Sequence, residues 1–161
     1  MTRPTLHLLA GLAGSGKPTL AARLAVEAHA LPIAEDDWTS ALWPGELTSL
    51  EAYRDRSRRL RGVLWPHVGL ILGMGVSVVL DFPANTRGQR AALAELLRGS
   101  DADHVLHFLD VPAEICCARV AARNRAGLHP FAPSPEDLDR VARYFEPPSD
   151  EEGFNVRRHA G

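Results

Sequence analysis

The stretch "TLHLLAGLAGSGKPTLAARLAVEAHA", residues 5–30, decides the fold. Residues 5–10 are an apolar run that ends at a glycine. From Thr19 onward, Leu20, Leu24 and Ala28 recur at helical spacing. The pattern predicts a strand, a glycine-rich loop and a helix.

The loop "GLAGSGK", residues 11–17, fits the pattern G-x-x-x-x-G-K. Its glycines let successive backbone N–H groups turn toward anionic oxygens at the start of a helix, whose dipole favours negative charge. A strand before the loop and a helix after it are the context that this pattern requires. We therefore interpret the segment as a nucleotide phosphate site formed by Gly11, Ala13, Gly14, Ser15, Gly16, Lys17 and Thr19. The alternative is a glycine-rich turn with an incidental lysine.

Lys17 is the only lysine among 18 basic residues, which suggests chemistry that arginine cannot supply. Pro18 follows it, where the full motif has a Ser or Thr whose hydroxyl binds Mg²⁺. Proline fits the first turn of a helix, so we expect the fold to survive. It also biases Lys17 away from helical geometry, and Thr19 lies about 100° further around the helix. We expect phosphate binding to persist and metal-assisted chemistry to weaken.

The rest of the chain alternates strands with helices. Apolar runs predict strands over residues 31–34, 75–81, 103–111 and 154–159. Helices are predicted from residue 35 and over 86–99, 112–125 and 134–145. Residues 49–72 predict one long helix or two shorter ones, because Gly62 and Pro66 interrupt the pattern. This alternation predicts an α/β fold with a parallel sheet covered on both faces.

Composition sets the broad class. The chain has 161 residues, 45% hydrophobic and 24% charged, which predicts a single domain over 1–161. Neither a secretory signal nor a membrane span is evident, so we expect a cytoplasmic protein with no membrane partner. The net charge of −2 argues against a global positive field for nucleic acid. The histidines are scattered, and the two in the 103–111 strand fall on opposite faces, so no metal cluster is predicted.

Several motifs together carry a family resemblance: "GLAGSGK" (11–17), "AEDDW" (34–38), "GVSVVLDFPANT" (75–86), "LHFLDVP" (106–112), and "ARVAARN" (118–124) before a loop containing "HPF" (129–131). The chain resembles small P-loop kinases of the polynucleotide kinase, zeta toxin and chloramphenicol phosphotransferase type. The resemblance implies a three-layer P-loop fold with about five parallel strands in the order 2-3-1-4-5. It also implies ATP and Mg²⁺ as cofactors, bound across the carboxyl ends of the strands.

The resemblance assigns roles to two carboxylates. Asp36 matches the aspartate that accepts the proton of the substrate hydroxyl, a role that also suits a carboxylate near the end of a central strand. Its neighbours Glu35 and Asp37 could be confused with it, and an acidic cluster that opens a helix is often only a favourable cap. Asp81 matches the position that holds Mg²⁺, with a turn aspartate as the alternative.

The resemblance also implies a mobile lid over about residues 119–133. Its Arg119, Arg123 and Arg125 would close on the triphosphate, with Arg119 and Arg123 on one helix face. Solvated arginines on a helix are the alternative. Asn124 and His129 could shape the lid or the adenine edge of the site.

The acceptor side is less constrained by the sequence. Trp38 could form an apolar wall, and Asn85, Arg87 and Arg90 could contact polar or phosphate groups of an acceptor. The expected reaction is transfer of the ATP γ-phosphoryl group to a hydroxyl of a small molecule, by a monomer or homodimer. Two alternatives stay open. One is a nucleic-acid or nucleotide 5′-hydroxyl kinase, for which arginines 54, 56, 58, 59 and 61 could line a basic groove, although a solvated helix face fits these arginines better. The other is a nucleotide-binding protein without turnover.

Overall fold

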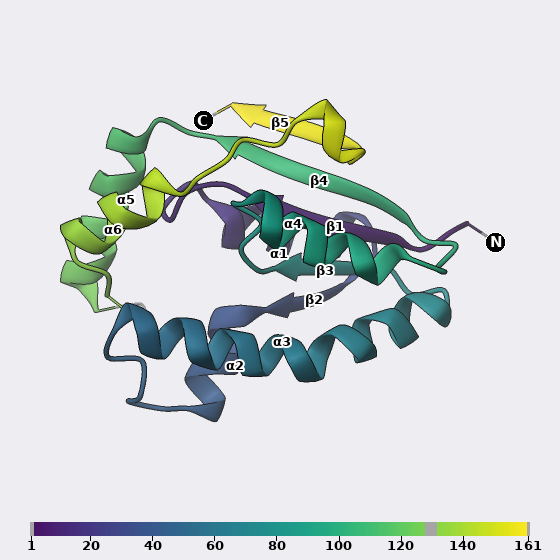
Figure 1. Ribbon diagram of the computed structural model, residues 1–161, viewed down its shortest axis with the longest axis horizontal. Helices are drawn as coiled ribbons and strands as arrows, with labels where there is room; N and C mark the ends of the chain where they lie inside the picture. The colour runs from purple at the N-terminus through teal and green to yellow at the C-terminus, as the bar shows by residue number, and fades with distance from the viewer. Residues whose placement is uncertain (1, 128–131, 161) are drawn as a thin grey trace.

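The computed structural model describes residues 2–127 and 132–160. Within them, five strands form one parallel sheet in the order β2-β3-β1-β4-β5 (Figure 1). The strands are β1 (Thr5–Ala10), β2 (Leu31–Ala34), β3 (Val78–Asp81), β4 (Asp103–Asp110) and β5 (Val156–Ala160). The predicted α/β class, the parallel sheet and the strand order are confirmed.

The helices follow the predicted pattern with small shifts at their ends. They are α1 (Lys17–Glu27), α2 (Glu35–Leu42), α3 (Leu50–Gly73), α4 (Arg87–Ala94), α5 (Ala113–Ala126) and α6 (Pro135–Arg143), with single 3₁₀ turns at Glu95–Leu97 and Asp150–Glu152. The sequence placed the third strand at 75–81, but the ladder begins only at Val78. None of the described helices is long and apolar enough to cross a bilayer.

Helix α3 is a single helix of 24 residues, although it contains Gly62 and Pro66. Ser49 begins it, because its side chain accepts a hydrogen bond from the Ala52 N–H at 3.0 Å. An internal proline costs about 3 kcal/mol. Leu60, Leu64 and Val68 recur every four residues and are buried against the sheet. Each such side chain stabilises by about 1.5–3 kcal/mol, so the buried stripe outweighs the proline.

The sheet separates two apolar layers. Leu6 and Leu8 of β1 belong to the cluster that contains the buried stripe of α3. Leu9 faces the other way and packs with Leu20 and Leu24 of α1. This alternation is the two-residue period of a strand, and it places helices on both faces of the sheet.

The carboxyl ends of the first three strands meet at one edge of the sheet. Ala34 of β2 lies in register with Asp81 of β3, and β3 pairs with β1 on its other side. The glycine loop after β1, the acidic start of α2 and the Asp81 carboxylate are therefore neighbours. In parallel α/β sheets this edge is where ligands bind.

Three of the histidines form a row across the sheet, which the sequence did not reveal. His7 Nδ1 lies 3.1 Å from His107 Nε2, and His107 Nδ1 lies 2.9 Å from His159 Nε2. The three residues come from β1, β4 and β5, which are neighbours only in the folded sheet. Burial lowers the pKa of His107 to about 4, so this row is neutral at physiological pH and supplies buried hydrogen bonds.

Candidate active site

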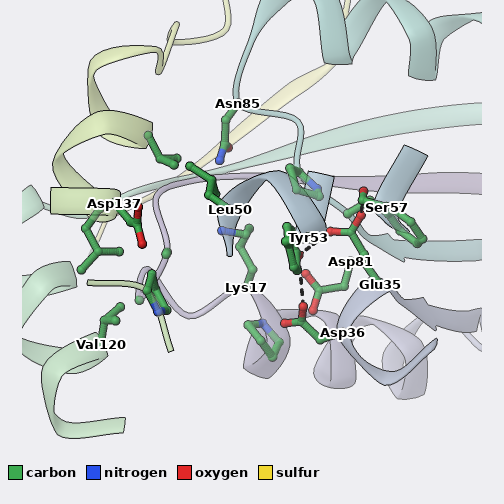
Figure 2. Close-up of a pocket in the computed structure, with 18 of the residues that line it drawn as sticks. Lys17, Glu35, Asp36, Leu50, Tyr53, Ser57, Asp81, Asn85, Val120 and Asp137 are labelled. Atoms are coloured by element: carbon green, nitrogen blue, oxygen red, sulfur yellow. Dashed lines mark hydrogen bonds between the residues drawn. The ribbon is translucent and has the colours of Figure 1, made fainter. Parts of the chain in front are cut away.

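A cavity of about 600 Å³ opens at the carboxyl edge of the sheet. Residues from the glycine loop, the starts of α1 and α2, the first half of α3, the segment after β3, and helices α5 and α6 line it. Figure 2 shows Val120 and Asp137 on one side of this pocket and Glu35, Tyr53 and Ser57 on the other, with Lys17 between them. The volume falls within the range of small-molecule sites.

The glycine loop, residues 11–16, has the backbone shape of a phosphate cradle. Gly14 and Gly16 have φ values of 85° and 100°, in the left-handed region that favours glycine. A Cβ at Gly14 would also lie 2.4 Å from the Cys116 carbonyl oxygen of α5. No described residue accepts a hydrogen bond from the amides of Gly14, Gly16 or Lys17. Amides arranged in this way at a helix start bind anions.

Asn85 holds this loop in place. Its Oδ1 accepts a hydrogen bond from the Gly11 N–H at 2.8 Å, across 74 residues of sequence. The sequence had offered Asn85 as a contact for the acceptor, and Asn85 does line the cavity, while its side-chain oxygen ties the loop to the segment after β3. The loop is thereby anchored at Gly11 to the segment that follows strand β3.

Lys17 folds back over the loop. Its Nζ donates to the carbonyls of Gly11, at 2.6 Å, and Leu12, at 3.1 Å. An ammonium has three N–H donors, so these two bonds leave a third for a ligand. Burial lowers the pKa of Lys17, and the nearby charges of Asp81 and Asp36 oppose that shift. The ammonium is therefore fixed beside both the loop amides and the carboxylates.

Pro18 does not break this arrangement. Helix α1 begins at Lys17, so the proline stands in its first turn, and the Leu20 N–H donates to the Gly16 carbonyl at 3.1 Å. The expectation that the fold survives the proline is confirmed, and Lys17 keeps helical geometry in spite of it. Pro18 and Thr19 both line the cavity. Position 18 itself offers neither a hydroxyl nor an N–H.

Asp36 and Asp81 face the ammonium in the same cavity. Burial raises the pKa of Asp81 to about 6, and the Lys17 charge acts against this rise. Two carboxylates beside an unsatisfied cradle suit Mg²⁺, which commonly takes one or two carboxylates together with waters and substrate phosphates. Across 2–127 and 132–160, no group of three or more His, Cys, Asp or Glu residues could hold a metal ion without such help.

Tyr53 of α3 connects the two acidic residues that open α2. Its hydroxyl donates to Glu35 Oε2 at 2.6 Å and to Asp36 Oδ1 at 3.1 Å, as the dashed lines of Figure 2 show. A hydroxyl has one proton, so it serves only one of these carboxylates at a time. Glu35 is 2% exposed and also accepts a hydrogen bond from Ser57. Neither Tyr53 nor Ser57 was predicted from the sequence.

Glu35 and Asp36 are thereby distinguished. Burial raises the pKa of Glu35, while its hydrogen bonds to Ser57 and Tyr53 oppose the rise. Both residues line the cavity, but Glu35 is buried and accepts hydrogen bonds from Tyr53 and Ser57 of α3, whereas Asp36 lies beside Lys17. Asp37 falls outside the described residues that line the cavity. Of the three neighbouring acids, Asp36 is the one that both lines the cavity and lies beside Lys17, and its role as the base stays a prediction.

The lid arginines separate into two groups. Arg119 and Arg123 line the cavity, and Arg119 Nη1 donates to the Gly14 carbonyl at 3.3 Å. Arg123 Nε is buried with no hydrogen-bond partner among the described residues. Arg125 is exposed and is not one of the described lining residues, because two helix positions from Arg123 turn it to the opposite face. The prediction that Arg125 belongs to the site is therefore not supported by the structure.

Helix α6 adds a wall that the sequence did not predict. Asp137, Leu138, Val141 and Tyr144 line the cavity opposite α3. The helix begins at Ser134, whose side chain accepts from the Asp137 N–H at 3.1 Å. Asn124 Nδ2 of α5 donates to the Pro133 carbonyl at 3.0 Å and so joins α5 to the start of α6. His129 and the rest of 128–131, the tip of the predicted lid, lie outside the described residues.

Three of the proposed acceptor contacts lie elsewhere. Trp38 is 43% exposed and is not among the described residues around the cavity. Arg90 is fully buried, where it pairs with Glu152 at 2.6 Å and donates to the Ala84 carbonyl at 2.9 Å. Arg87 lies 3.6 Å from Glu151 on the surface. Both arginines therefore join the segment before β5 to α4, and neither reaches the cavity in the described structure.

The arginines of α3 also separate. Arg56, Arg58 and Arg59 form ion pairs with Asp55, at 2.9, 2.7 and 2.9 Å. Arg56 pairs in addition with Glu46 at 2.6 Å. Arg54 and Arg61 line the cavity instead, and neither has an ion-pair partner among the described residues. Of the five arginines considered for a basic groove, three are thus paired with acidic residues and two line the cavity.

Solved structures share the fold. The chain is similar to a provisionally assigned kinase from Chloroflexus aurantiacus, with a TM-score of 0.80 and 20% identity over 99% of this chain and 89% of that one. It is also similar to Chaetomium thermophilum Kti12 in complex with ADP-AlF₃, with a TM-score of 0.71 and 17% identity over 96% and 88% of the two chains. For the Mycobacterium tuberculosis APS kinase in complex with AMPPNP and APS, the TM-score is 0.62 and the identity 22%, over 99% and 90%.

The sequence comparisons give the family. No curated protein matches the chain significantly in sequence. A family model described as an AAA domain, AAA_33, matches residues 6–148, which is most of the chain. The strand order and the glycine loop at the end of β1 agree with the P-loop kinase fold that the sequence predicted. The chain therefore belongs to the AAA_33 family of AAA domains and is a P-loop kinase-like protein.

Proposed function

We propose that the protein is a phosphotransferase that moves the γ-phosphoryl group of ATP to a hydroxyl of a small molecule. One observation carries the proposal: Lys17, folded over a loop whose Gly14 and Gly16 amides have no hydrogen-bond partner among the described residues, shares a single cavity with Asp36 and Asp81. Phosphoryl transfer depends on positioning and on charge stabilisation, and these groups supply both. The fold shared with kinases is consistent with this chemistry.

In the proposed reaction, the loop amides and the third N–H of Lys17 hold the triphosphate. Asp36 accepts the proton of the acceptor hydroxyl, whose oxygen forms a bond to the γ-phosphorus while the bond to the β–γ bridging oxygen breaks and ADP leaves. Arg119 and Arg123 lie on the lid side of the cavity, where their charge would stabilise the transferring group. Tyr53 positions Asp36 through its hydrogen bond.

Asp81 is the residue that would hold Mg²⁺, directly or through water. When bound, the ion would neutralise charge on the phosphates. Because Pro18 lacks the hydroxyl that usually completes this site, we propose that the protein binds the ion through Asp81 and the nucleotide alone. Turnover would then be slower than in a chain with Ser or Thr at position 18.

Pro18 also supports a second candidate function, which is nucleotide binding without turnover. The cradle, Lys17 and the cavity are present, and only the metal-ligand position has changed. A nucleic-acid acceptor has less support, because Arg56, Arg58 and Arg59 are paired with acidic residues rather than turned toward a groove.

The test combines calorimetric ATP binding with ADP release across a panel of hydroxyl compounds that includes sugars, polyols and nucleosides. The proposal predicts ATP binding and ADP release that depends on one class of acceptor. The Asp36→Asn variant should bind ATP normally and release no ADP above background. ATP binding without acceptor-dependent release from any compound would favour the second candidate. Loss of ATP binding altogether would contradict both.

A further inference from the structure

The cavity has a second cationic cluster, on the side away from the glycine loop. Arg54, Ser57 and Arg61 of α3 all line the cavity. They are three and four residues apart, so they lie in one row on a single face of the helix. Arg54 and Arg61 are about 10 Å apart along the helix axis, a separation that two long side chains can close onto one group.

This cluster lies beside the acceptor side of the proposed reaction. Ser57 donates to Glu35, and the charge of Arg61 acts on the same carboxylate by opposing the rise in its pKa. Tyr53, one residue before Arg54, donates to Asp36, the proposed base. Lys17 belongs to the loop, and Arg119 and Arg123 belong to α5. Figure 2 shows Val120 of α5 on the side of the cavity opposite Ser57. Arg54 and Arg61 are therefore additional to the cations assigned to the triphosphate.

The neighbouring arginines show that pairing on this helix is selective. Asp55 and Glu46 engage Arg56, Arg58 and Arg59 through ion pairs of 2.9 Å or shorter. Arg54 and Arg61 have no ion-pair partner in 2–127 or 132–160. Glu35 is already occupied by Ser57 and Tyr53. Two guanidinium groups that line a cavity without an ion-pair partner among the described residues suit an anion from outside the chain.

We propose that the acceptor carries an anionic group, a phosphate or a carboxylate, in addition to the hydroxyl that is phosphorylated, and that Arg54 and Arg61 bind this group. This inference rests on the proposed function and names its substrate class. The hydroxyl would reach Asp36 while the anion sits along α3. A cavity of about 600 Å³ fits a compact metabolite of this kind better than a polymer, whose flanking phosphates would meet the paired surface of α3.

The experiment measures acceptor binding with the triphosphate site already filled. The protein is saturated with AMPPNP and Mg²⁺, and matched pairs of compounds are titrated by calorimetry: glycerol with glycerol 3-phosphate, ribose with ribose 5-phosphate, and glucose with gluconate. Filling the loop with AMPPNP prevents the anion from binding there. We expect at least one charged member to bind about tenfold or more tightly than its neutral partner, as a charge-assisted hydrogen bond allows. Whether a phosphate or a carboxylate is preferred separates the two sources of charge.

Variants connect the preference to the two arginines. Arg54→Gln and Arg61→Gln should each weaken binding of the charged compound about tenfold and leave AMPPNP binding unchanged. Arg59→Gln is the matched control, because Arg59 is exposed on the same helix and paired with Asp55. It should leave both affinities unchanged.

Each outcome decides a separate point. If AMPPNP does not bind, the proposed function fails. If AMPPNP binds but no charged compound is preferred over its neutral partner, the inference fails and the proposed function stands. The same holds if the preference survives in a variant that carries both Arg54→Gln and Arg61→Gln. Preferential binding of a single-stranded oligonucleotide over every small anion would also overturn it, in favour of a nucleic-acid acceptor.

Discussion

The two sides of the cavity are constructed in different ways. The phosphate side is a short continuous segment, residues 11–19, in which we propose that backbone amides and one lysine bind the phosphates. The acceptor side is assembled from separate side chains of α2 and α3, such as Asp36 and Arg61, which are 25 residues apart in sequence. A backbone site tolerates a change of side chain, such as proline at position 18, whereas a side-chain site depends on each residue. The predictions below test this contrast.

The largest loss of nucleotide affinity should come from Lys17→Met. It keeps the length of the side chain but removes the charge that bridges the loop carbonyls and the phosphates. We expect ATP affinity to fall by about 100-fold or more, as for the loss of a charged hydrogen-bonding group. Calorimetry with ATP measures the loss. Lys17→Arg should not restore binding, since a planar guanidinium cannot fold over the loop in the same way, and full recovery with arginine would contradict this view.

Asp36→Asn should affect the other side of the cavity alone. Removing a general base lowers turnover by about 10²- to 10⁴-fold. The ATP affinity should stay within about twofold of the unaltered protein, because the loop is untouched. Single-turnover measurements separate the two quantities. Asp37→Asn provides the control, because Asp37 is not among the described residues that line the cavity. Equal losses of turnover in Asp36→Asn and Asp37→Asn would show that Asp36 is not the general base.

The pH dependence of turnover should follow the ionisation of the Asp81 carboxylate. Its pKa of about 6 means that the carboxylate is ionised above pH 6 and neutral below it. Metal-supported turnover needs the ionised form, so kcat/KM should fall about tenfold per pH unit below pH 6. A profile that is flat from pH 7 to pH 5 would exclude Asp81 from the reaction.

The same pKa predicts an effect on stability. A raised pKa means that the folded state favours neutral Asp81, so this contribution is present at low pH and is lost as the pH rises through about 6. Asp81→Asn should therefore stabilise the fold by about 1–3 kcal/mol at pH 8 and by little at pH 4. Denaturant unfolding of the two proteins at both pH values measures the difference. If Asp81→Asn is less stable than the unaltered protein at pH 8, the ionised Asp81 carboxylate stabilises the fold and the prediction is wrong.

The smallest loss of turnover is expected from Tyr53→Phe. It removes the hydroxyl that donates to Glu35 and Asp36, and it leaves the buried Glu35 with one partner fewer. The free energy of unfolding should fall by about 1–3 kcal/mol. Turnover should fall several-fold, with ATP affinity unchanged. Tyr144→Phe is a matched control, since Tyr144 lines the same cavity but is 64% exposed. Equal effects of the two variants would deny Tyr53 its positioning role.

The contrast between the two sides also explains what the sequence could predict. The loop, its strand and its helix are contiguous, so their pattern is readable from residues 5–30 alone. Asp81 could be placed because it ends an apolar strand, and parallel strands end at one edge. The strand order followed from the family resemblance. Pro66 was a misleading signal for α3, because packing of the buried stripe outweighs the local preference of one residue.

The remainder depends on contacts between distant positions. Arg90 is fully buried only because Glu152 returns beside it 62 residues later, and an isolated arginine carries no sign of that. Asn85 and Gly11 are 74 residues apart, and Tyr53 meets Asp36 through the packing of α3 on α2. The two types of arginine on α3 differ by their partners and not by their spacing. Such pairings are settled by the fold rather than by local pattern.

The central claim is that the loop and Lys17 bind a triphosphate although proline follows the lysine. Its most direct test is a calorimetric titration of ATP, with and without Mg²⁺, into the unaltered protein and the Pro18→Thr variant. We predict that both proteins bind ATP and that only the variant gains substantially from Mg²⁺, because the hydroxyl supplies a metal ligand. Failure of the unaltered protein to bind ATP under either condition, with binding restored in Pro18→Thr, would contradict the claim.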